Sequence, residues 1–114
     1  MNRHEEILHQ SIAVTWHNKF RNNPEMFQRL ICNWTNQDNG RAGNKARSMG
    51  VKKGITDWVY MREYGHVIWI ELKVGDNTQS PEQIQFEKLC LLLGHQYVIC
   101  REYEMFWKII GIEI

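Results

Sequence analysis

The sequence predicts an α/β fold in which helices flank a mixed central sheet. Three observations carry this prediction. Apolar residues recur at every fourth position near the N-terminus, two runs of β-forming residues flank a turn in the middle, and a helix-start motif followed by another β-forming run comes after them. The 114 residues are close to the usual size of one domain, so we expect 1–114 to form one domain.

A stripe of four apolar residues predicts a helix over 2–20. Four apolar residues recur at every fourth position, which puts their side chains on one side of a helix: Leu8, Ile12, Trp16 and Phe20. The Asn-Asn-Pro run at 22–24 ends this helix or bridges it to the next element.

The segment after this helix is predicted to be less regular. We expect a strand in the later half of 27–35, a turn-rich loop at 36–40, and a short basic helix over 42–49 that stops at Gly50.

The second half of the chain has the clearest pattern. The segments 55–61 and 66–72 are rich in β-forming residues, and 62–65 between them predicts a hairpin turn. A short strand at 96–100 and a final helix over 102–110 are expected to follow.

A helix-start motif lies between the hairpin and the last strand. Ser80 suits the N-cap, Pro81 suits the first helical position, and Gln83 suits the third. The predicted helix runs to about residue 93 and stops at Gly94.

The composition excludes several classes of protein. No run of about 18 apolar residues is present, so no membrane-spanning helix is expected. Three cysteines without a Cys-x-x-Cys pair argue against a disulfide scaffold and against a structural zinc site. The N-terminal segment lacks an apolar signal core, and we therefore expect a cytoplasmic protein.

The positive charge of the chain is concentrated in one segment. The stretch between residues 40 and 54 has no acid and five basic residues: Arg41, Lys45, Arg47, Lys52 and Lys53. Because the net charge of the whole chain is +1, the rest of the chain has a net charge of −4. Such a segment indicates either a localised contact with phosphates or a solvated loop, and the charges alone leave both open.

The predicted hairpin contains the side chains with the clearest chemistry. Alternate side chains of a strand share a face, so Glu71 and Lys73 point the same way, while Ile68, Ile70 and Leu72 point into a core. By itself this spacing also suits a surface ion pair.

Asp57 is predicted to lie opposite Glu71. If the hairpin turns about Tyr64, the numbers of cross-strand partners sum to about 128, and opposed Cβ atoms lie roughly 5 Å apart. Two opposed carboxylates repel unless a cation neutralises them, and such a pair suits Mg²⁺. Lys73 beside them is suited to orienting a water or stabilising phosphate charge. A different register, with two unrelated surface acids, is the alternative.

Three short motifs stand out: Gly-Val-Lys-Lys-Gly-Ile-Thr-Asp at 50–57, Ile-Glu-Leu-Lys at 70–73 and Ser-Pro-Glu-Gln at 80–83. Together they resemble the VRR-NUC family, the virus-type replication and repair branch of the PD-(D/E)xK nucleases, and the similarity covers about 30–110. One departure is Thr56, where the family usually has proline. The resemblance implies a PD-(D/E)xK restriction-endonuclease-like core.

The resemblance also implies roles for the residues of the hairpin. Asp57 and Glu71 would bind the metal together with the backbone carbonyl of Leu72, and Lys73 would position or activate the attacking water. The expected metal is Mg²⁺, with Mn²⁺ as a possible substitute.

A glutamate on the first helix usually completes such a site. Glu6 fits best, because Gln10 follows it with the family's Glu-x-x-x-Gln spacing. Glu5 is the alternative, because it lies on the same helical side as Leu8 and Ile12.

Two further positions match the family. Gln83 is expected to hydrogen-bond near the site or the phosphate, although its place at a helix start explains it without any function. Lys53 is interpreted as a phosphate contact and Gly54 as permitting close backbone approach. The DNA contacts would include the rest of the basic segment: Lys52, Arg47, Lys45 and Arg41.

The resemblance implies a metal-dependent, structure-specific DNA endonuclease. Stand-alone members resemble phage-encoded Holliday junction resolvases. This resemblance implies that branched DNA is the partner and that the protein acts in the host cytoplasm. It also implies a homodimer with two active sites, because a junction needs two symmetric cuts. The aromatic C-terminal stretch is a hypothesis for the dimer interface: Tyr103, Met105, Phe106 and Trp107. Flap, nicking or restriction-like nucleases and a catalytically inactive DNA-binding module are the alternatives.

Overall fold

The fold is built on one four-stranded mixed sheet. The computed structural model describes residues 3–34 and 48–114. Within them the strands lie in the order β1 (Leu30–Cys32), β2 (Trp58–Met61), β3 (Val67–Leu72) and β4 (Gln96–Cys100). The pairs β1–β2 and β2–β3 are antiparallel, whereas β3–β4 is parallel, and this confirms the predicted mixed sheet.

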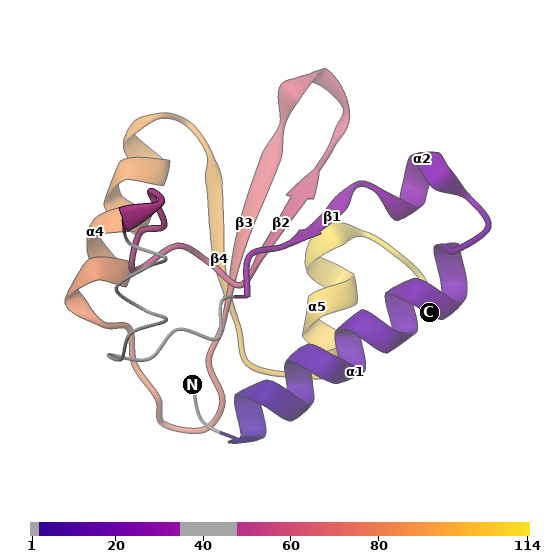
Figure 1. Ribbon diagram of the computed structural model, residues 1–114, viewed down its shortest axis with the longest axis horizontal. Coiled ribbons are helices and arrows are strands. Elements are labelled where there is room, and N and C mark those ends of the chain that lie inside the picture. The colour runs from indigo at the N-terminus through magenta and orange to yellow at the C-terminus, as the bar shows by residue number, and fades with distance from the viewer. Residues whose placement is uncertain (1–2, 35–47) are drawn as a thin grey trace.

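Helices cover both faces of this sheet (Figure 1). The helices α1 (Arg3–Phe20) and α5 (Tyr103–Ile110) pack against each other and against one face, and α4 (Pro81–Leu92) covers the other. The described residues contain no helix that is long and apolar enough to span a membrane.

The apolar stripe predicted for the first helix forms part of the core. Leu8, Ile12 and Trp16 are buried, and the helix spans nearly the predicted range. The turn after it contains an unpredicted short helix, α2 (Pro24–Phe27), which Asn23 caps by accepting a hydrogen bond from the backbone N–H of Met26.

The hairpin has the predicted register. Trp58 pairs with Ile70 and Val59 with Trp69, so the numbers of each pair sum to 128. The chain reverses through a short 3₁₀ turn (Glu63–Gly65), in which Tyr64 adopts a positive φ of 62°. Continued by one residue beyond Trp58 and Ile70, the same register sets Asp57 opposite Glu71.

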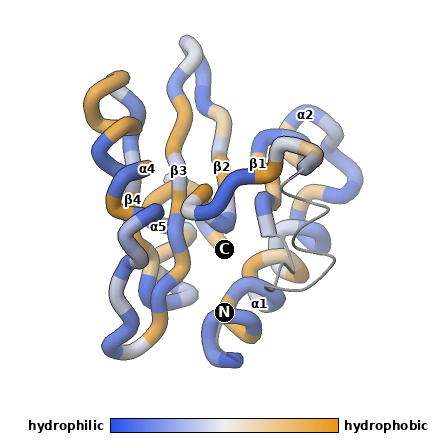
Figure 2. Tube along the Cα trace, turned by 60° about the vertical axis from the view of Figure 1, so that its left-hand side comes forward, coloured by the Kyte–Doolittle hydropathy of each residue, from blue (hydrophilic) through white to orange (hydrophobic). Residues whose placement is uncertain are grey.

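The two faces of β3 meet different helices. Ile68, Ile70 and Leu72 are almost completely buried in the core between the sheet and the helices α1 and α5, as predicted. Trp69 packs edge-to-face on Phe86 of α4, with ring centroids 5.0 Å apart. Figure 2 shows apolar residues along β3 and again at the C-terminal end of α4. Because one face of β3 lies against α4, Glu71 also faces the layer that contains this helix.

The proposed dimer interface at the C-terminus is wrong for two of its four residues. Phe106 and Trp107 are buried in the core, where Trp107 stacks on Trp16 with centroids 6.3 Å apart. Tyr103 is half-buried and shares a hydrogen bond with Thr15. The amphipathic pattern of α5 therefore serves the core of the same chain. The loop predicted at 36–40 and residues 42–47 of the predicted basic helix lie outside the described residues.

Candidate active site

Asp57 and Glu71 form a buried carboxylate pair at the end of the hairpin. Only 7% of Asp57 and 2% of Glu71 are exposed. The Oδ2 atom of Asp57 accepts a hydrogen bond of 2.8 Å from the backbone N–H of Leu72, and the two carboxyl groups act on each other's pKa. The hairpin register therefore brings together two acids that lie 14 positions apart in the sequence.

The surroundings of this carboxylate pair favour protonation. Burial and the negative charge of Asp57 raise the pKa of Glu71 to about 9. Burial also raises the pKa of Asp57, although the N–H of Leu72 opposes this change. Without a cation the pair therefore keeps a proton at neutral pH, and a bound divalent cation would replace it.

The donor atoms of the carboxylate pair suit a hard divalent cation. Among the described residues, Oε1 of Glu71 is a buried oxygen without a hydrogen-bond partner. Oxygen ligands are those that Mg²⁺ prefers, and Mg²⁺ keeps several waters. Within 3–34 and 48–114, no three His, Cys, Asp or Glu side chains are grouped closely enough to bind a metal together. The ligand set would thus rely on two carboxylates, water and backbone carbonyls such as that of Leu72.

Lys73 places a cation at the edge of the carboxylate pair. Its Nζ atom lies 4.0 Å from Oε2 of Glu71, and 13% of its side chain is exposed. Its backbone N–H donates to the carbonyl of Cys100 in β4, so the main chain at this position is fixed by the sheet. Lys73 can therefore contact both Glu71 and a molecule that approaches from solvent.

Gln83 makes a helix-capping contact and also a contact with Glu71. Its Oε1 atom accepts a hydrogen bond from the backbone N–H of Ser80, while the hydroxyl of Ser80 accepts one from the N–H of Gln83, which completes a capping box. Its Nε2 atom donates to Oε2 of Glu71 over 3.2 Å. The start of α4 is thereby tied to the carboxylate pair.

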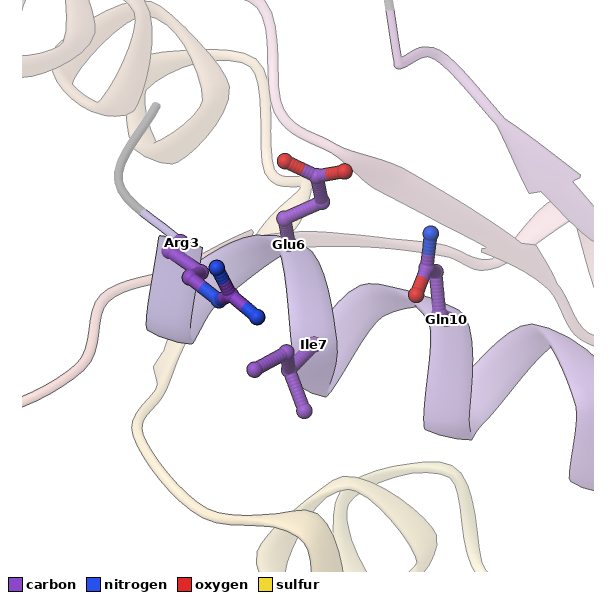
Figure 3. A pocket seen from close by; sticks show the side chains of 4 residues that line it. All are labelled: Arg3, Glu6, Ile7 and Gln10. Atoms are coloured by element: carbon purple, nitrogen blue, oxygen red, sulfur yellow. The ribbon is translucent and has the colours of Figure 1, made fainter.

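The structure brings Glu5, and not Glu6, to this cluster. Glu5 is 3% exposed, and its charge acts on the pKa values of both Asp57 and Glu71. Glu6 is exposed and lines a separate pocket with Arg3, Ile7 and Gln10 (Figure 3).

The difference follows from the helical period. Glu5 lies three residues before Leu8 and seven before Ile12, so it shares the buried side of α1. The sequence shows this helical spacing of Glu5, whereas the Glu-x-x-x-Gln spacing of the family favours Glu6 with Gln10.

Two of the five predicted DNA contacts lie in the described part of the chain. Lys52 and Lys53 are both exposed. The close approach at Gly54 is to α4, since a Cβ atom there would lie 2.7 Å from the backbone carbon of Glu82. The lysines are therefore presented beside the start of the helix that contains Gln83. Arg41, Lys45 and Arg47 lie outside the described residues.

Asn77 is a site residue that the sequence did not indicate. Its Nδ2 atom donates a hydrogen bond of 2.9 Å to Glu5. The segment 76–80 predicted only a polar loop, and nothing in its composition distinguishes one asparagine that contacts a buried acid from a solvated one.

The fold matches that of a solved protein domain. A solved structure described as "VRR_NUC domain protein" superimposes with a TM-score of 0.64, covers 90% of this chain and 84% of its own chain, and is 18% identical in sequence. No family model and no curated protein matches the sequence. At this identity the similarity establishes the fold, and the motif-based resemblance is confirmed at that level. The chain has the PD-(D/E)xK α/β fold of the VRR-NUC domain.

Proposed function

We propose that this protein is a metal-dependent, structure-specific DNA endonuclease. The observation that carries the proposal is the buried pair of Asp57 and Glu71, with Nζ of Lys73 4.0 Å from Glu71. Burying two acids against each other is unfavourable for folding, and a divalent cation offsets this repulsion. The nuclease-domain fold supports the same proposal.

The proposed metal ligands are the carboxylates of Asp57 and Glu71 and the carbonyl of Leu72. Mg²⁺, or Mn²⁺ in its place, would supply Lewis-acid stabilisation of phosphate charge and a bound water of lowered pKa. Glu5 adds a negative charge that attracts the cation, and Gln83 holds Oε2 of Glu71 in place. We assign the role of the first-helix acid to Glu5 because Glu6 lies in a different pocket.

Lys73 is proposed to position the attacking water. Its ammonium group lies beside Glu71 and is partly open to solvent, so it can hydrogen-bond a water and a phosphate oxygen. The water gives up a proton to solvent as its oxygen adds to phosphorus, the bond from phosphorus to the leaving oxygen breaks, and solvent donates a proton to that leaving oxygen.

The exposed lysines next to α4 are proposed to contact DNA phosphates. Lys52 and Lys53 lie in the basic segment of the chain and directly precede Gly54, whose backbone lies close to Glu82 at the start of α4. Lysine contacts of this kind position the nucleic acid without reading its sequence. We also assign this role to Arg41, Lys45 and Arg47 from their positions in the sequence.

The proposed substrate is a four-way DNA junction. Resolving a junction requires two symmetric cuts, and a two-fold homodimer supplies two active sites with the matching symmetry. A solution mass of one subunit at micromolar concentration, together with complete junction cleavage, would contradict the dimer.

A cleavage assay on labelled DNA tests the function. The substrates are a four-way junction, a flap, a nicked duplex and a linear duplex, each incubated with Mg²⁺ or with EDTA. Paired symmetric cuts in the junction alone, abolished by EDTA and by Asp57→Ala, are the expected result.

The other outcomes of this assay are also informative. Metal-dependent cutting of flaps or duplex would keep the active site and change the substrate. Binding without any cutting would overturn the endonuclease and leave a DNA-binding module of the same fold.

A further inference from the structure

The carboxylate of Glu5 is held by the loop between β3 and α4. Its Oε1 atom accepts one hydrogen bond of 2.9 Å from Nδ2 of Asn77 and another of 3.3 Å from the backbone N–H of Val74. Asn77 follows Glu5 by 72 positions in the sequence, so this contact ties the first helix to the end of the hairpin.

The same loop is anchored on its other side. The Nη1 atom of Arg101 donates hydrogen bonds of 3.1 Å to the carbonyl oxygens of Gly75 and Asn77. Arg101 directly follows β4, and the N–H of Lys73 is bonded to the neighbouring Cys100. The backbone that presents Asn77 is therefore fixed to the sheet from two positions.

A buried acid at this position needs such support. The negative charge of Glu5 raises the pKa values of Asp57 and Glu71, which means that the three carboxyl groups repel one another. N–H donors stabilise a buried carboxylate, whereas a carboxylate that loses a donor rotates away from its neighbours or takes up a proton. An amide side chain supplies the donor without adding a fourth negative charge.

We infer that Asn77 is a positioning residue, which holds the carboxylate of Glu5 near, but not within, the pair of Asp57 and Glu71 and so raises the affinity of the site for a divalent cation. This inference rests on the proposed metal-dependent function. Arg101 supports it by fixing the backbone of Asn77. Outer groups that orient a ligand typically change metal affinity roughly 10–100-fold when they are removed.

The test is a double-mutant cycle that is read out by metal binding without DNA. Mn²⁺ is titrated into the wild type, Asn77→Leu, Glu5→Gln and the double variant, and the free ion is measured by electron paramagnetic resonance. Leucine keeps the branched shape and the number of heavy atoms of asparagine and removes the donor. Asn22→Leu, at an exposed position beyond the far end of α1, is the matched control.

The cycle separates positioning from a merely structural role. If Asn77 acts through Glu5, Asn77→Leu weakens Mn²⁺ binding roughly tenfold in the wild type and changes nothing in the Glu5→Gln background. Equal losses in both backgrounds, or none in either, would overturn the inference. Should thermal unfolding in EDTA show that the leucine variant does not fold, Asn77→Ser replaces it in the cycle.

Failure of this inference can be told apart from failure of the proposed function. A wild type that binds Mn²⁺ and cuts DNA, with Asn77→Leu indistinguishable from it, overturns the role of Asn77 alone. A wild type that binds Mn²⁺ but cuts no DNA overturns the endonuclease, and the cycle still decides whether Asn77 acts through Glu5.

Discussion

At the scale of the residue, Glu71 determines most of the chemistry of the site. It lies opposite Asp57, accepts a hydrogen bond from Gln83, and lies 4.0 Å from the ammonium group of Lys73. Its carboxylate is nevertheless buried, and its pKa is raised to about 9. The charged form of Glu71 therefore destabilises the metal-free protein, and in the proposed function a bound cation would stabilise this charged form.

We predict that Glu71→Gln abolishes cleavage and stabilises the metal-free protein at pH 8. The pKa of Glu71 is higher in the folded state than the usual 4.5, so between pH 4.5 and about 9 the folded state binds more protons than the unfolded state. Stability therefore falls as pH rises through this window, and a neutral glutamine removes that loss. Thermal unfolding in EDTA at pH 5 and pH 8 should show an advantage of the variant that grows with pH, by about 1–3 kcal/mol.

We predict that Lys73→Ala binds DNA like the wild type and cleaves it at least roughly 100-fold more slowly. The ammonium group lies at the carboxylate pair, where charge would develop in the proposed reaction, and not among the exposed lysines of the basic segment. Single-turnover cleavage and a binding titration on the same junction measure the two effects. Lys88→Ala, at an exposed position of α4, is the control, and full cleavage by Lys73→Ala would remove Lys73 from the mechanism.

At the scale of the element, the start of α4 connects the basic segment to the site. Its capping box uses Ser80 and Gln83, and the same glutamine side chain reaches Glu71. Gly54 lies against Glu82 in the first turn of the helix. A single helix start therefore contacts both Glu71 and the segment that contains Lys52 and Lys53.

We predict that Gly54→Ala destabilises the fold by about 2–4 kcal/mol. Its φ of 87° is unfavourable for residues other than glycine, and its Cβ atom would lie 2.7 Å from the backbone of Glu82. Gly94→Ala is the matched control, because Gly94 has a similar φ of 81° and nothing within 4 Å of the added Cβ atom. Urea unfolding should show a clearly smaller loss for Gly94→Ala, and equal losses would mean that the contact with α4 contributes nothing.

At the scale of the whole molecule, the site lies where three layers of structure meet. The hairpin supplies Asp57 and Glu71, α1 supplies Glu5, and α4 supplies Gln83. Helices from both faces of the sheet thus converge on one end of it (Figure 1). A cation bound there would connect parts of the chain that are far apart in sequence, and it would therefore stabilise the fold as a whole.

We predict that Mg²⁺ raises the unfolding temperature at pH 8 and that EDTA reverses the change. At a free concentration about ten times the dissociation constant, binding to the folded state alone adds about 1.4 kcal/mol, which is roughly 5 °C for a chain of this size. Asp57→Asn should lose the shift, because it removes one of the proposed ligands. A shift of the same size in that variant would place the cation elsewhere.

The sequence by itself determined most of the described helices and strands and the central part of the candidate site. Periodicity fixed α1, the helix-start motif fixed α4, and the position of the turn fixed the register that sets Asp57 opposite Glu71. These features depend on interactions between residues that are near in sequence or joined by one tight turn, so that local patterns suffice to predict them.

Only the tertiary structure decided which distant residues complete the site. Choosing Glu5 over Glu6 depends on how α1 is rotated against the sheet, and the roles of Asn77 and Arg101 depend on where the loop after β3 comes to rest. The burial of Phe106 and Trp107 likewise depends on the packing of α5 against α1. The physical reason is that burial and long-range hydrogen bonds arise when whole elements pack together, and a linear pattern of residue types does not specify that packing.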